Sequence, residues 1–73
     1  MPVPLKGRHE DKSGTYYVGD SKVSLTDAME KAYEVAKPDY KGKTIELLVE
    51  AIYVKGTNPI SEWVVKMGPL PGA

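Results

Sequence analysis

A stripe of apolar residues at helical spacing is the clearest pattern in the chain. Ser24 precedes the stripe and can cap a helix, and Asp27 stands three residues later, an acidic version of the capping box. Asp27 and Lys31 are spaced to form an i,i+4 ion pair on the polar side, and Pro38 should end the helix at or before Lys37. The pattern predicts a helix over 25–36. Its apolar positions are Leu25, Ala28, Met29, Ala32, Val35 and Ala36.

Three further segments have the alternation and the β-branched or aromatic content of strands. Residues 15–18 form a short first strand, closed by a turn at 19–21, and residues 60–67 form a last strand after the turn signal at 56–59. The long segment 44–55 alternates with period two, although its Glu, Leu and Ala also suit a helix; β-branched residues favour the strand. One face of this segment carries Ile45, Leu47, Val49, Ala51 and Tyr53, and one face of the last strand carries Trp63, Val65 and Met67.

These elements predict an α+β fold of order β-α-β-β, a three-stranded antiparallel sheet with one helix. One helix covers only one face of such a sheet, yet the late part of segment 44–55 is apolar on both faces. An apolar sheet face without a cover in its own chain usually marks a contact with another subunit. The pattern therefore predicts an oligomer.

Length and composition support the same prediction. Domains of about 70 residues rarely bury enough core to be stable alone, and disulfides, a metal or oligomerisation usually compensate. The 73-residue chain has no Cys and a single His, His9, so it has no disulfide and we expect no metal site. Residues 1–14 are predicted to be an extended or flexible arm, 15–68 the domain, and 69–73 a tail.

The charge balance and hydropathy exclude several kinds of partner. Ten Lys and Arg balance ten Asp and Glu, which leaves no basic footprint for nucleic acid. No apolar run approaches the ~18 residues of a membrane span. We therefore expect a cytoplasmic protein that binds neither nucleic acid nor membranes.

Catalytic patterns are weak, and we expect no enzyme. His9 lies in the predicted arm without a Ser or Cys partner, and Glu46 and Glu50 are separated by about 13 Å along the predicted strand. Trp63 could stack on a planar ligand, but packing in the core or at an interface is the more frequent role of such a residue.

Two segments carry a resemblance to a known family. Residues 18–28, VGDSKVSLTDA, resemble the dodecin pattern V-G-x-S-x-x-S-W-x-D-A, and residues 60–67, ISEWVVKM, are similar to the last dodecin strand, I-x-E-Y-x-V-x-L. Leu25 stands where the family usually has Trp or another bulky residue. The resemblance covers about residues 15–67.

The resemblance implies a dodecin-like fold, in which the three-stranded sheet wraps partly around the helix and twelve subunits form a hollow shell. It also implies binding and sequestration of a flavin (FMN, riboflavin or FAD) between subunits. The family positions that stack on and hydrogen-bond the flavin ring, a Trp and a Gln, correspond here to Thr44 and Val64. Two hypotheses follow: a shell that stores flavin or another small planar ligand, and a dodecin-like structural or interaction protein that binds no flavin.

Overall fold

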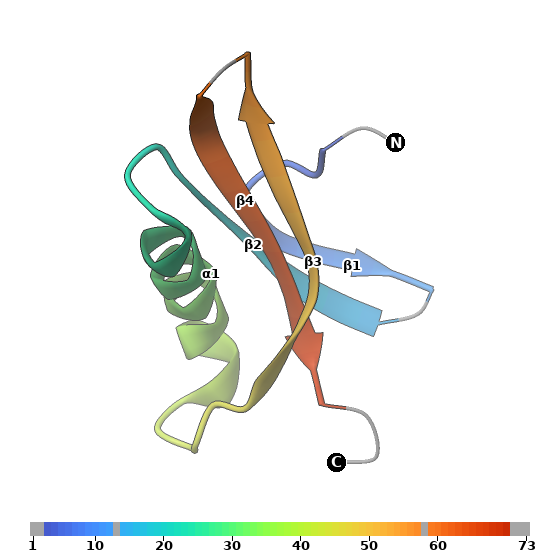
Figure 1. Ribbon diagram of the computed structural model, residues 1–73. Coiled ribbons are helices and arrows are strands. Elements are labelled where there is room, and N and C mark those ends of the chain that lie inside the picture. Colours follow the sequence, from blue (N-terminus) through green and yellow to red (C-terminus); the bar gives the residue numbers. More distant parts are fainter. Residues whose placement is uncertain (1–2, 13, 58, 71–73) are drawn as a thin grey trace.

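The computed structural model describes residues 3–12, 14–57 and 59–70, which form one antiparallel sheet of four strands with a helix on one side (Figure 1). The strands lie in the order β1-β2-β4-β3. The elements are β1 (Gly7–Asp11), β2 (Gly14–Ser21), α1 (Leu25–Tyr40), β3 (Leu47–Gly56) and β4 (Ile60–Pro69). The α+β class is confirmed, and β2, α1, β3 and β4 follow the predicted order, but the predicted number of three strands is wrong.

The additional strand, β1, lies within the predicted N-terminal arm. It pairs antiparallel with β2, with His9 opposite Tyr16 and Asp11 opposite Gly14. Gly14 has φ +129°, a conformation that favours glycine at the end of this hairpin. The run of charged residues suggested a solvated tail. The prediction was misleading because a strand at the edge of a sheet can be just as highly charged. Residues 1–2 of the predicted arm and 71–73 of the predicted tail lie outside the described residues, and Pro69 belongs to β4.

A buried serine organises the start of the helix. Ser24 is the N-cap as predicted, and its hydroxyl accepts the backbone N–H of Asp27 at 3.1 Å. Ser21, only 3% exposed, donates its hydroxyl to the Asp27 carboxylate at 2.7 Å and accepts the backbone N–H of Val23 at 2.9 Å. The predicted Asp27–Lys31 ion pair is also present, at 3.2 Å. The last residue of β2 and the first turn of α1 thus form one hydrogen-bonded unit.

The helix continues past Pro38 to Tyr40, so its predicted end was wrong. A proline removes one backbone donor, which costs least near a helix terminus, where few turns remain to be disrupted. Lys41 caps the end of the helix: its φ of 40° is left-handed, and its N–H donates to the carbonyl oxygen of Lys37 at 3.2 Å.

A β-bulge changes which residues of β3 face the helix. Val49 lies opposite Met67, but Ala51 lies opposite Lys66 and Ile52 opposite Val65, so Glu50 is an extra residue. Paired residues share a side of the sheet, and we call the helix side the inner side and the other the outer side. The predicted face was therefore correct for Leu47 and Val49 and wrong beyond them. Ile52 and Val54 face inward, whereas Ala51 and Tyr53 face outward.

The core lies where α1 crosses β2 and β4. Three alanines on α1, Ala28, Ala32 and Ala36, are fully buried. Two residues of β4, Val65 and Met67, pack against Ala28 and Ala32. A Cβ at Gly19 of β2 would collide with backbone atoms of Ala28 and Ala32, so the helix backbone lies directly on this strand.

Gly19→Ala should destabilise the fold. A methyl group there would lie within 2.9 Å of the Ala32 Cα and even closer to backbone atoms of the helix, so α1 must move away from β2. Overpacking of this kind costs about 1–3 kcal/mol of unfolding free energy, which urea unfolding followed by Trp63 fluorescence would measure. Adding Ala32→Gly should not restore stability, because the colliding atoms belong to the backbone. Recovery in the double variant would contradict the close contact.

A second contact joins β1 and β2 to the end of the helix. The Asp39 carboxylate accepts hydrogen bonds from the Arg8 Nε and from the Tyr17 hydroxyl, both at 2.7 Å. These two hydrogen bonds hold the pKa of Asp39 below its usual value. Burial, followed by the hydrogen bond to Asp39, raises the pKa of Tyr17 to about 12.

The raised pKa of Tyr17 should appear as a loss of stability at high pH. A group with a raised folded-state pKa contributes stability that is complete below its unfolded value, 10.0, and is lost as the pH rises toward about 12. The free energy of unfolding in urea should therefore fall more between pH 10 and 12 for the parent protein than for Tyr17→Phe. The variant has no phenol to ionise at this site. Equal losses in the two proteins would contradict this assignment.

Candidate functional site

The inner side of β3 is an apolar surface that the helix leaves open. Within the described residues, α1 contacts β1, β2 and β4 but does not lie over β3, and the β3–β4 hairpin extends past the start of the helix (Figure 1). Leu47 and Val49 reach the edge of the core, whereas Ile52 and Val54 remain 50% and 55% exposed. We call these four residues the β3 inner surface.

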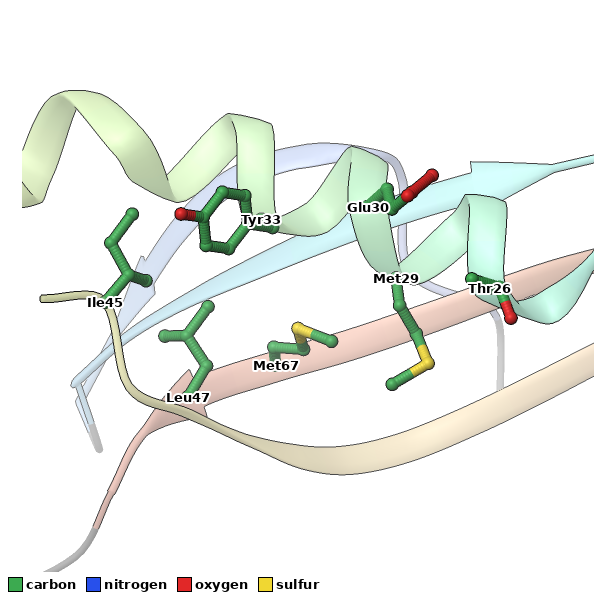
Figure 2. Close-up of a pocket in the computed structure, with 7 residues that line it drawn as sticks. All are labelled: Thr26, Met29, Glu30, Tyr33, Ile45, Leu47 and Met67. Carbon is green, nitrogen blue, oxygen red and sulfur yellow. The ribbon is translucent and has the colours of Figure 1, made fainter.

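An apolar groove continues this surface between the helix and the start of β3. It has a volume of about 370 Å³, within the range of small-molecule sites. Met29, Met67, Leu47 and the ring of Tyr33 extend into the space between helix and sheet, and the Glu30 carboxylate points away from the sheet (Figure 2). The groove is lined by Thr26, Met29, Glu30, Tyr33, Ile45, Leu47 and Met67.

The outer side of the sheet has a different character. His9 stacks on Tyr16 with ring centroids 4.9 Å apart, and the Lys66 Nζ lies 4.4 Å from the centroid of the Tyr16 ring. Lys66 also pairs with Glu50 at 3.6 Å, and His9 Nε2 lies 2.6 Å from the carbonyl oxygen of Leu5. His9 is thus part of a sheet and not of an exposed arm, and its ring is held by packing and a hydrogen bond.

The residues suggested by the family pattern do not form one site within a chain. Thr44 is exposed and precedes β3, while Val64 is 2% exposed and lies opposite Tyr53 on the outer side. Leu47, the first residue of β3, pairs with Pro69, so the register does not bring Thr44 and Val64 together. Neither residue supplies the aromatic ring or the amide that the family pattern has at these positions, and Thr44 and Val64 form no shared site within one chain.

Trp63 lies on the inner side, opposite Val54, partly buried against the core. It therefore packs in the manner that the sequence favoured, at the border between the core and the β3 inner surface.

No family model, no curated protein and no solved structure matches the chain. The site must accordingly be interpreted from its own chemistry. Among the described residues, no group of three or more His, Cys, Asp or Glu side chains could hold a metal ion. The one described helix is too short and too polar to cross a membrane.

Sequence reasoning found the uncovered strand but missed the groove. Ile45 and Leu47 belonged to the predicted apolar face, but Tyr33 was not part of the helical stripe. Tyr33 follows Met29 by four residues, which places the two side chains on adjacent turns of one helix face. This spacing was the pattern in the sequence that indicated a wall of the groove.

Proposed function

We propose that the protein is a subunit of a homo-oligomeric, dodecin-like assembly and that the β3 inner surface is buried between subunits. The observation that carries this proposal is the half-exposed pair Ile52 and Val54, on a strand that its own helix does not cover. Complete burial of one such side chain contributes about 1.5–3 kcal/mol, so an assembly gains from every copy of this surface.

The fold supports the same proposal. Residues 14–69 contain a strand, a helix and two further strands, with the last strand placed between the other two, and the sheet lies against the helix on one side only. The resemblance implies twelve copies and a role in which the assembly itself, and not catalysis, is the function. A cytoplasmic location is part of the proposal, supported by the absence of cysteine.

Lysine substitutions on the β3 inner surface should dissociate the assembly without unfolding the subunit. Ile52→Lys and Val54→Lys each place a charge at a site that is half exposed in the single chain but buried in the proposed assembly. Light scattering should give a particle many times heavier than 8.0 kDa for the parent protein and at least tenfold weaker association for either variant.

Val23→Lys is the matched control. Val23 is 79% exposed between β2 and α1, outside the β3 inner surface, and its replacement should leave the particle mass unchanged. Circular dichroism would confirm that all three variants are folded. A parent protein that stays monomeric at high concentration would contradict the proposal.

A second candidate function is the binding of a planar ligand, with flavin as the leading choice. The observation that favours it is the groove beside Tyr33, whose apolar walls and aromatic ring suit a flat ring system better than the positions of Thr44 and Val64 do. Two methionines in the groove add side chains that adapt to the shape of a ligand.

Titration with FMN or riboflavin tests this candidate. Binding should quench the flavin fluorescence at micromolar concentration, and Tyr33→Ala should weaken binding about tenfold, because stacking on an aromatic ring contributes about 1–3 kcal/mol. Tyr33→Phe keeps the ring and should bind nearly as well as the parent protein. The absence of quenching by either flavin would leave the assembly itself as the function.

A further inference from the structure

The two edges of the sheet differ in a way that selects one of them for pairing. The β1 edge has five residues and is highly charged, which is how natural sheets prevent pairing with another chain. The β3 edge has ten residues without proline, and Glu50 and Lys55 are its only charged side chains. Among the described residues, no strand pairs with the free edge of β3.

We infer that the β3 edges of two copies pair antiparallel about a two-fold axis at Tyr53, joining two four-stranded sheets into one. This inference rests on the proposed homo-oligomeric function and specifies the contact within it. Backbone hydrogen bonds across the new pair would satisfy the free edge, as they do when a peptide strand joins a sheet.

The charges on β3 favour the antiparallel direction. Glu50 lies in the first half of the strand and Lys55 near its end, and both are on the outer side, where they pair with Lys66 at 3.6 Å and with Glu62 at 3.9 Å. Antiparallel pairing places Glu50 beside Lys55 of the second copy, so the two ion pairs extend into one alternating row. Parallel pairing in register would instead place like charges side by side.

The bulge and the apolar residues favour an axis at Tyr53. Because Glu50 and Ala51 share one position in the ladder, an axis at Tyr53 puts them opposite Lys55 of the second copy. The same axis puts Ile52 opposite Val54 of the second copy, and both face inward, so these half-exposed apolar side chains contact each other as a cross-strand pair. An axis one residue earlier would place Lys55 opposite Leu48 and lose the charge match.

Disulfide trapping tests the axis directly, because the chain contains no cysteine. Opposed residues of an antiparallel pair have Cα atoms about 4.5–5.5 Å apart, within the range of a disulfide. Tyr53→Cys should therefore form a covalent dimer on mild oxidation, seen as doubling of the 8.0 kDa mass under non-reducing conditions. Tyr16→Cys, on the outer side of β2, is the matched control and should remain a single chain.

A second measurement covers the case in which Tyr53→Cys does not fold. Glu50→Cys and Lys55→Cys proteins, refolded together and oxidised, should form the mixed disulfide dimer in preference to either self-linked dimer. Light scattering of the reduced proteins separates this inference from the function on which it rests. An assembled particle without the trapped dimers would overturn the two-fold pairing alone, whereas a monomeric parent protein would overturn both.

Discussion

The helix lies directly on the backbone of β2 through small residues. Ala28 and Ala32 contact the backbone of β2 at Gly19, and this close approach fixes α1 over β2 and β4. A helix with its side chains is about 10–12 Å wide and neighbouring strands are about 4.8 Å apart, so one helix covers about two strands. The helix therefore leaves the inner side of both edge strands, β1 and β3, largely uncovered.

The two edge strands differ in the residues that they present on this uncovered side. On β1 the inner side carries polar groups, and Arg8 bonds both Glu10, at 2.8 Å, and Asp39 at the end of the helix. Water can solvate this strand, so it needs no further cover. On β3 the corresponding positions are Leu47, Val49, Ile52 and Val54, for which water is a poor partner. The asymmetry of the sheet is thus a difference in chemistry between the inner sides of its two edge strands.

The parts of this arrangement that follow from local patterns were predictable from the sequence. The capped start of α1 at Ser24 and the inward face of Trp63, Val65 and Met67 depend on residues a few positions apart. The strand β1 was missed although it forms a local hairpin with β2, because its charged residues lack the apolar alternation of a strand, and the bond from Arg8 to Asp39 joins residues distant in sequence. The bulge at Glu50 was also missed, since strict alternation through segment 44–55 has no place for an extra residue. One residue there reverses the direction of every later side chain in β3.

The same reversal decides where the apolar surface lies. With unbroken alternation, Ala51 and Tyr53 would have faced inward, and the exposed Ile52 and Val54 would have faced outward beside the charged Lys66 and Glu50. The bulge instead brings Ile52 and Val54 to the inner side, in line with Val49 and next to Trp63, while the ion pairs of Glu50 and Lys55 stay on the outer side. Both charged side chains of β3, Glu50 and Lys55, are thereby kept on the side opposite to Ile52 and Val54. Ile52 and Val54 therefore lie half exposed beside the core on the inner side of an edge strand, which is where the second copy of the proposed assembly would complete that core.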